Sequence, residues 1–253
     1  MSFFKKGMAS IFGIGGTKID TIITSVNIKP GDVIQGYCKI KGGSVPQEIA
    51  GINLSVYTSY KKELDDSTVT KTECIQNIPI NINGIINPGE TTEVPFSFVL
   101  DYRTPISMHK SKVWIGTNLD ITKAIDSGDK DYIEVQPLDA VYATLNAMSH
   151  LGFNIREVEN IYDNKNWSKF KFIQEFEFIA NSGPYRGRFD EIEMVFVPRE
   201  HYIDIYIEID TKVRGLFSAL AEVTGLDETN KKIRLGYEDA NPRDIAKAIE
   251  SIL

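Results

Sequence analysis

The feature of this sequence that most restricts its fold is an alternation of apolar and polar residues with a period of two. Residues 202–209 read Tyr-Ile-Asp-Ile-Tyr-Ile-Glu-Ile, and residues 52–60 largely follow the same alternation. Successive side chains of a β-strand point to opposite faces, so this period predicts strands with one buried face. The 253 residues include 34 Ile and 15 Val against 12 Leu and 12 Ala, and β-branched residues favour strands over helices. We therefore predict a mainly β fold.

Turn sequences separate the predicted strands of the first half at short intervals. Each turn contains glycine, which tolerates positive φ angles, and two also contain proline, which presets the backbone for a reversal. The turns lie at Lys29–Asp32, Lys41–Ser44 and Asn87–Glu90. Many short strands joined by such turns are typical of an antiparallel β-sandwich.

The alternating pattern is interrupted at residues 126–137, where an acidic, glycine-containing stretch precedes Pro137. Domain boundaries fall in polar linkers of this kind, where few contacts cross. We therefore place a boundary near Pro137. The predicted organisation is an N-terminal amphipathic helical segment (1–16), a β-sandwich domain (17–136) and a smaller β domain (137–253).

The second domain is predicted to begin and end with a helix. Residues 139–151 carry apolar residues at helical spacing, and about five strands follow, including a hairpin that turns at 198–200. These strands are too few for a second sandwich, so we expect a barrel-like or open sheet. Asn241 is a suitable N-cap and Pro242 suits the first helical position, so a C-terminal helix is predicted.

Composition argues against two classes of partner. The net charge is −7 and no basic patch is visible, whereas a protein that binds nucleic acid needs basic residues to neutralise phosphates. No apolar run of about 20 residues is present, so no membrane span is predicted. Residues 1–16 lack the features of a secretory signal. Cys38 and Cys74 are too few for a disulfide framework, and we expect both to be free and buried in a cytoplasmic protein.

The sequence contains no recognisable motif for catalysis or for a cofactor. The three histidines, His109, His150 and His201, lack the spacing of a metal site, and there is no H-E-x-x-H, C-x-x-C or G-x-S-x-G motif. Residues 13–18 resemble a phosphate-binding loop only faintly, and a flexible joint before the first strand is the favoured interpretation. We therefore expect no catalytic residue, no bound metal and no cofactor.

An acidic cluster in the predicted linker has two interpretations. Asp126, Asp129 and Asp131 together could ligate calcium, because this cation prefers several oxygen ligands within a short loop. The cluster lacks the twelve-residue EF-hand pattern. A solvated loop between the domains is therefore the favoured interpretation.

A second acidic cluster lies in the pattern of a strand. Glu191 and Glu193 share one face of this strand and, with Asp190, could supply the acid and base of a carboxylate-dependent hydrolase. Arg186 and Arg188 lie close by in the sequence. A structural network of ion pairs on an exposed sheet face is the favoured interpretation.

The N-terminal segment provides the candidate interaction residues. On a helical wheel Phe4, Met8, Ile11 and Phe12 share one arc, with Phe3 at its border. An exposed patch of large apolar side chains needs a cover. The cover could be the chain's own sandwich, a second copy in a homodimer or a membrane surface. Two lysines attract anionic lipid only weakly, and the glycines that follow allow the segment to reach outward, so we favour the dimer narrowly.

Several motifs, taken together, resemble the bacterial sporulation-control protein family, which is related to arrestins. Residues 28–36, 87–90 and 94–100 are similar to the turns and the Pro-Phe-Ser-Phe segment of arrestin-type domains. More specific motifs follow, in the same order as in the family. The first, at residues 114–121, reads Trp-Ile-Gly-Thr-Asn-Leu-Asp-Ile, and the others lie at residues 151–160, 174–178, 183–188 and 225–229.

This resemblance extends over nearly the whole chain. It implies an arrestin-like fold for the N-terminal sandwich and a non-enzymatic, regulatory role in sporulation or the cell cycle. The expected partners are other proteins, such as signalling or cell-division components. The resemblance implies no cofactor and no catalytic residue. The residues themselves leave two other functions open: a peripheral membrane module that uses the N-terminal segment, and a carboxylate-dependent hydrolase.

Overall fold

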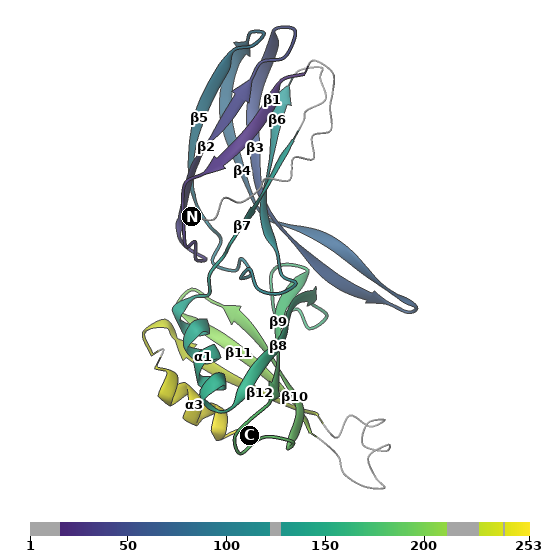
Figure 1. Cartoon of the computed structure of the whole chain (residues 1–253), viewed down its shortest axis with the longest axis vertical. Helices are drawn as coiled ribbons and strands as arrows, with labels where there is room; N and C mark the ends of the chain where they lie inside the picture. The colour runs from purple at the N-terminus through teal and green to yellow at the C-terminus, as the bar shows by residue number, and fades with distance from the viewer. Residues whose placement is uncertain (1–15, 122–127, 212–227, 240) are drawn as a thin grey trace.

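The computed structural model describes residues 16–121, 128–211, 228–239 and 241–253. The first part of the chain folds into two facing sheets, which form the upper half of Figure 1. One sheet is antiparallel, in the order β1-β2-β5, and the facing layer is built around β3, which pairs with both β4 and β6. The strands are β1 (Lys18–Ile23), β2 (Val33–Lys41), β3 (Gln47–Leu64), β4 (Ser67–Ile86), β5 (Thr91–Val99), β6 (Val113–Ile121) and β7 (Asp129–Ile133).

The interior of this sandwich consists of the alternate residues that the sequence marks as apolar. Ile34 of β2, Leu54 of β3 and Ile115 of β6 have no measurable exposure, and Phe96 and Phe98 of β5 close the same core. The turns between the strands use glycine as predicted: Gly31 and Gly89 both have positive φ angles. These features confirm the antiparallel sandwich.

The second part of the chain contributes five antiparallel strands, and two helices pack on one face of them (Figure 1). These strands lie in the order β12-β11-β10-β9-β8, and β8 then pairs with β3, so that they form one nine-stranded sheet with β3, β4, β6 and β7 of the sandwich. The expectation of about five strands in the second part is confirmed, as an open sheet and not a closed barrel within the described residues. The elements are α1 (Asp139–His150), β8 (Phe153–Tyr162), β9 (Phe172–Ala180), β10 (Phe189–Pro198), β11 (Tyr202–Thr211), β12 (Glu228–Gly236), the single 3-10 turn η1 (Tyr237–Asp239) and α3 (Pro242–Glu250).

The two helices cover the apolar face of this sheet. Their buried side chains, including Met148 of α1 and Ile249 of α3, pack with residues such as Ile192, Ile205 and Ile207 in one core. Helix α3 begins as the sequence predicts, because the side chain of Asn241 accepts a hydrogen bond of 3.0 Å from the backbone N–H of Arg243. None of the described helices is long and apolar enough to cross a membrane.

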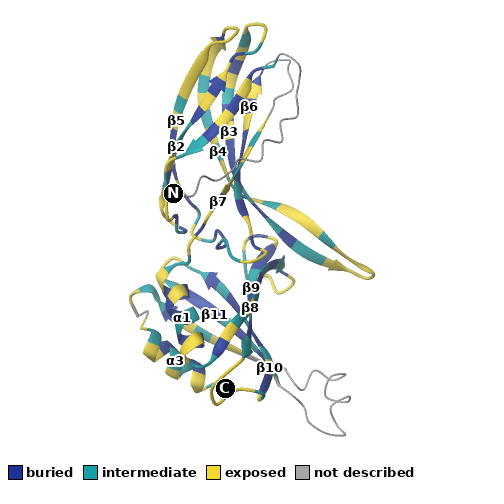
Figure 2. Ribbon diagram, viewed as in Figure 1, coloured by how far each residue is buried: buried dark blue, intermediate teal, exposed yellow. Residues whose placement is uncertain are grey.

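The β3–β4 hairpin extends beyond the sandwich, and its outer end is mostly exposed (Figure 2). Along its length β3 touches the second part of the chain through a parallel pairing of Lys61 with Ile161. The ring of Tyr60 stacks on Phe172 with centroids 6.2 Å apart. Buried Asn160 donates hydrogen bonds to the Thr58 hydroxyl at 2.8 Å and to the carbonyl of Ser59 at 3.0 Å.

Each of the two hydrophobic cores also contains side chains from the other part of the chain. Phe170 and Phe172 follow β8 in the sequence but belong to the sandwich core, whereas Ile106 belongs to the core beneath the helices. The Gln174 side chain both accepts from and donates to the backbone of Ile106, at 3.0 and 2.8 Å. The boundary near Pro137 stays a prediction, and these contacts join its two sides.

Two expectations from the sequence are corrected by the structure. Asp129 and Asp131 lie in strand β7 and not in a solvated loop, and the Asp129 carboxylate accepts a hydrogen bond of 2.7 Å from the backbone of Thr21; Asp126 lies outside the described residues. Cys38 is buried, which raises the pKa of its thiol to about 11, but Cys74 is exposed. Both cysteines are free, as predicted.

Candidate functional site

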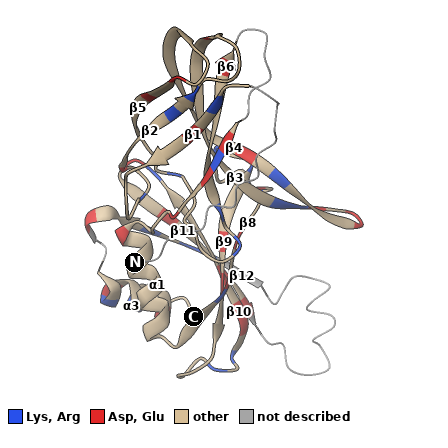
Figure 3. Ribbon diagram, turned by 45° about the horizontal axis from the view of Figure 1, so that its top comes forward, with Lys and Arg blue, Asp and Glu red and all other residues tan. Residues whose placement is uncertain are grey.

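The candidate site lies on the face of the β8–β12 sheet opposite the helices. Strand geometry creates this face, because residues that alternate with the buried isoleucines and methionines must point the other way. On β10, Glu193 and Val195 alternate with buried Ile192 and Met194. The outward face therefore combines charged, aromatic and apolar side chains. Figure 3 shows acidic residues on β10 in red.

The strand register places four carboxylates in one row across this face. Glu157 of β8 is opposite Glu177 of β9, Glu177 is opposite Glu193 of β10, and Glu193 is opposite Glu208 of β11. In the next row Glu175 of β9 is opposite Val195 of β10. Like charges that face one another across strands destabilise a sheet, so the row needs compensation.

Basic side chains compensate most of these carboxylates. Arg156 forms an ion pair with Glu177 at 2.8 Å and another with Glu191, and Lys165 pairs with Glu208 at 3.1 Å. The two carboxylates of β8 are also paired: Glu157 forms an ion pair with Lys110, and Glu159 forms one with Lys61 of β3. The network predicted for this face is therefore present.

The partners in this network differ from those expected from the sequence. Glu191 pairs with Arg156 of β8, and not with Arg186 or Arg188, which precede it in the chain. The guanidinium of Arg188 instead lies over the rings of Tyr185 and Phe189. Because β9 lies between β8 and β10 in the sheet, Arg156 reaches both Glu177 of β9 and Glu191 of β10.

Two carboxylates of this face, Glu175 and Glu193, lie outside the network. None of the described basic side chains forms an ion pair with either of them. Burial is the largest cause that raises their pKa values, neighbouring carboxylates add to it, and the nearby charge of Lys165 offsets part of the rise: the pKa of Glu175 rises to about 8 and that of Glu193 to about 7. At neutral pH the pair therefore holds at least part of one proton.

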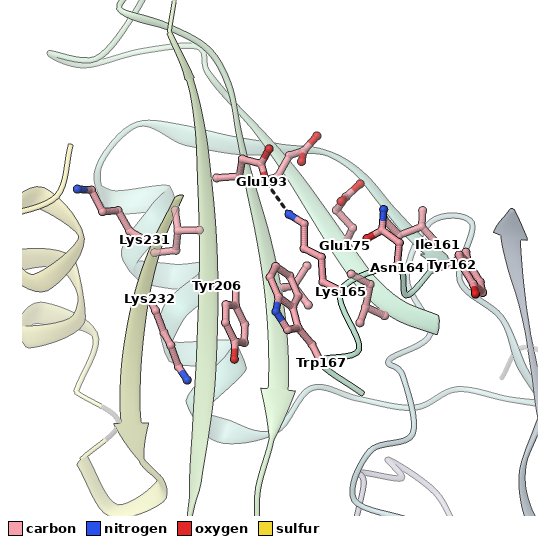
Figure 4. Close-up of a pocket in the computed structure, with 14 residues that line it drawn as sticks. Ile161, Tyr162, Asn164, Lys165, Trp167, Glu175, Glu193, Tyr206, Lys231 and Lys232 are labelled. Atoms are coloured by element: carbon pink, nitrogen blue, oxygen red, sulfur yellow. Dashed lines mark hydrogen bonds and ion pairs between the residues drawn. The ribbon is translucent and has the colours of Figure 1, made fainter. Parts of the chain in front are cut away.

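These two carboxylates line a pocket of about 380 Å³ (Figure 4). Trp167 and Tyr206 form one wall and stack face to face, with centroids 4.0 Å apart and planes inclined by 11°. Ile173 and Val195 are buried beneath the aromatic pair. Pockets of about 300–1,000 Å³ that combine apolar walls with a few polar groups are the usual binding sites of proteins.

A fixed loop holds Trp167 and Lys165 at this pocket. The buried carboxylate of Asp163 accepts hydrogen bonds from the backbone N–H groups of Lys165 at 3.1 Å and of Ser168 at 2.7 Å. Arg199 donates a hydrogen bond of 3.2 Å to the carbonyl of Trp167. Lys165 and Trp167 lie together at the pocket in Figure 4, and Lys165 forms an ion pair of 3.1 Å with Glu208. The aromatic wall is therefore positioned before any ligand enters.

The arrangement could in principle hold a metal ion. Glu175, Glu177 and Glu193 each offer one carboxylate oxygen, and these oxygens lie within 4.8 Å of one another. Glu177, however, already accepts two hydrogen bonds from the Arg156 guanidinium, at 2.9 and 2.8 Å. A cation that is bound by Glu175 and Glu193 alone leaves this ion pair intact.

The other candidates from the sequence contribute little to this site. Phe3, Phe4, Met8, Ile11 and Phe12 lie outside the described residues. The three histidines lie in a loop, at the end of α1 and in the β10–β11 turn, and none joins the acidic group within the described chain. Of the residues suggested for acid–base chemistry, Glu193 lines the pocket.

Sequence reasoning did not identify Glu175, Trp167 or Tyr206 as site residues. The alternation of Glu175 and Glu177 with Phe176 and Phe178 was the available signal, because it places both carboxylates on the outward face of β9. The neighbours of this face follow only from the pairing of β9 with β10.

Comparison with known proteins gives one consistent result. The family model for Spo0M, described as SpoOM protein, matches residues 4–213. The chain is 35% identical over 254 residues to "Sporulation-control protein spo0M" of Bacillus subtilis (strain 168), covering 100% of this chain and 98% of that protein. It also matches the crystal structure of Spo0M, a sporulation control protein from Bacillus subtilis, with a TM-score of 0.83 and 31% identity. That match covers 94% of this chain and 98% of the other.

Proposed function

Because the chain belongs to the SpoOM protein family, we propose that it regulates sporulation by binding other proteins and not by catalysis. The observation that carries this proposal is the match to a sporulation-control protein along the full length of the chain. A regulatory protein without its own chemistry acts through its surfaces. The outward face of the β8–β12 sheet, with its pocket, is the surface to which we assign this role.

The packing of the chain supports a scaffold role. One face of the second sheet is used to bury α1 and α3, and the opposite face presents a preformed pocket. The ion pairs around that pocket and the stacked aromatic wall hold its side chains in place. A preorganised surface binds a partner with less loss of conformational entropy than a mobile one.

We also propose that the N-terminal segment, residues 1–16, mediates self-association in the cytoplasm. The apolar arc of Phe4, Met8, Ile11 and Phe12 supports self-association. The two cysteines are free, which supports a reducing compartment such as the cytoplasm. Self-association would present two copies of the sheet face to one partner. Two linked sites bind a partner with repeated epitopes more tightly than one site does.

Complementation tests the proposed function. The chain is expressed in Bacillus subtilis from which the related sporulation-control protein has been removed, and heat-resistant spores are counted. We expect the spore count to return toward that of the parent strain. An unchanged count, with the protein present at the normal level by immunoblot, contradicts the proposal.

A further inference from the structure

The pocket on the β8–β12 sheet has a chemical composition that selects one class of ligand. It offers two neighbouring carboxylates, Glu175 and Glu193, next to an aromatic and aliphatic wall. We propose that this pocket binds the basic side chain of an arginine or lysine that is presented by a partner protein. The inference rests on the proposed function and names the chemistry by which the partner is recognised.

The charge balance of the face is the first argument. Glu157, Glu159, Glu177, Glu191 and Glu208 are each matched by a basic side chain of the chain itself. Within the described residues, the two carboxylates that line the pocket without such a partner are Glu175 and Glu193. A guanidinium or ammonium group placed between these two carboxylates would form ion pairs with them, as Arg156 does with Glu177 and Lys165 does with Glu208.

The shape of an arginine or lysine side chain is the second argument. Both side chains carry a charged head on an apolar stem, so they bind best where carboxylates and apolar surface meet. The pocket has this combination, because Ile173, Val195 and the Trp167–Tyr206 pair lie beside the carboxylates. Its volume of about 380 Å³ is sufficient for one such side chain.

A metal ion would use these features less well. Ca²⁺ takes about six to eight oxygen ligands, and the third available carboxylate, Glu177, is already held by Arg156. The ammonium group of Lys165 also lies at the pocket and would repel a double charge more than a single one. The ring faces of the aromatic wall supply no oxygen ligand for a metal ion, whereas they can pack against an alkyl chain.

The position of the pocket favours a ligand that is part of another protein. Helices α1 and α3 pack on the opposite face of the sheet, so within the described residues they do not cover the outward face. A basic side chain that projects from a partner can therefore enter while its backbone stays at the surface of the sheet.

Binding of a cation should release protons near neutral pH. Burial and neighbouring carboxylates raise the pKa values of Glu175 to about 8 and of Glu193 to about 7, and a bound cation would lower both. The neighbours that raise these pKa values are Glu177 of β9, Glu191 of β10 and Glu208 of β11, and Lys165 of the preceding loop lowers them. Other charged groups on the surrounding elements are Arg156, Glu157 and Glu159 of β8 and Lys232 of β12.

The test uses the full chain and a matched pair of peptides. The sequence has two tryptophans, so the variant Trp114→Phe leaves Trp167 as the single tryptophan reporter in the pocket wall. Acetyl-Gly-Arg-Gly-amide is titrated at pH 7.5, and the same peptide with uncharged citrulline serves as the control ligand. We expect the arginine peptide to change the Trp167 fluorescence saturably, to release protons in calorimetry, and to bind about tenfold or more tightly than the citrulline peptide.

Protein variants separate the pocket from the rest of the surface. Glu175→Gln with Glu193→Gln should weaken binding of the arginine peptide by about tenfold or more, whereas Glu93→Gln, an exposed carboxylate on β5, should bind like wild type. Equal binding of the two peptides, saturation by MgCl₂ in place of the peptide, or unchanged binding by the double variant overturns the inference. Since the peptide test needs no sporulating cells, its failure is distinguishable from failure of complementation.

Discussion

Carboxylate oxygens of Glu175 and Glu193 lie within 4.8 Å of one another on neighbouring strands of an open sheet, and no described basic side chain pairs with either. Two half-buried carboxylates at this distance cannot both ionise at low cost, so they take up protons more readily than isolated glutamates do. This relationship links the pH dependence of the fold to the occupancy of the pocket.

The first prediction concerns stability as a function of pH. The folded pKa values of Glu175 and Glu193, about 8 and about 7, lie above the ordinary glutamate value of 4.5. As pH rises from about 4.5 to 8, the unfolded chain loses these protons first, so the fold loses stability. Glu175→Gln should therefore be more stable than wild type by about 1–2 kcal/mol at pH 9, and equally stable at pH 4.

Urea denaturation at both pH values measures this difference. Glu93→Gln changes an exposed carboxylate in the sandwich and provides the control, with no change expected at either pH. If Glu175→Gln lowers stability at pH 9, the two carboxylates are not the uncompensated charges that the structure indicates.

The second prediction concerns the buried carboxylate of Asp204. Burial alone would raise its pKa, but hydrogen bonds from Arg234 at 2.9 Å and from Lys232 outweigh burial and lower it. A lowered pKa adds stability above the ordinary value of about 3.8, and this stability is lost as pH falls. Asp204→Asn should cost about 1–3 kcal/mol at pH 7 and progressively less below pH 4.

Thermal or urea unfolding of this variant is compared with Asp244→Asn, whose carboxylate is exposed on α3 and lies 3.4 Å from Lys247. The control should change stability by less than about 0.5 kcal/mol. Equal effects of the two substitutions would contradict the assignment of Asp204 as the centre of a buried network.

The third prediction concerns the junction between β3 and β8. The Asn160 side chain is 2% exposed and donates to Thr58 and Ser59, so Asn160→Ala leaves buried polar groups without a partner. We expect a loss of about 1–3 kcal/mol. We also expect faster amide hydrogen exchange at residues 58–62 than in β1. Asn53→Ala, on the exposed face of β3, is the control, and identical exchange in both variants would refute the junction role.

The fourth prediction concerns residues 1–16. If the apolar arc of this segment mediates self-association, the full chain is a dimer and a chain lacking residues 1–14 is a monomer. Multi-angle light scattering measures both masses. A monomer in both cases removes the proposal, and a dimer in both cases moves the interface to the described part of the chain.

The elements with strong local patterns could be predicted from the sequence alone. Residues 202–209 form β11 with the isoleucines buried, and Asn241 caps α3, because period-two alternation and capping chemistry are local. Strand β7 could not be assigned with the same ease. Its aspartates suggested a loop, and its place in the sheet depends on pairing with β6.

The candidate site was beyond a purely local analysis. Glu175 and Glu193 are 18 positions apart, and only the register of β9 against β10 makes them neighbours. Trp167 lies in a loop without periodicity, and its place at the pocket depends on stacking against Tyr206 of β11. Sequence patterns give the face on which a side chain lies, whereas strand pairing determines which side chains meet.

The most direct test of the central claim is the spore count in the complemented Bacillus subtilis strain with variants of the pocket. Wild type and Glu93→Gln should both restore the count of heat-resistant spores, because they keep the charges that receive a partner's basic side chain. The double variant Glu175→Gln with Glu193→Gln, present at the same level, should not restore it. Full restoration by the double variant would contradict the claim that this pocket mediates the regulatory function.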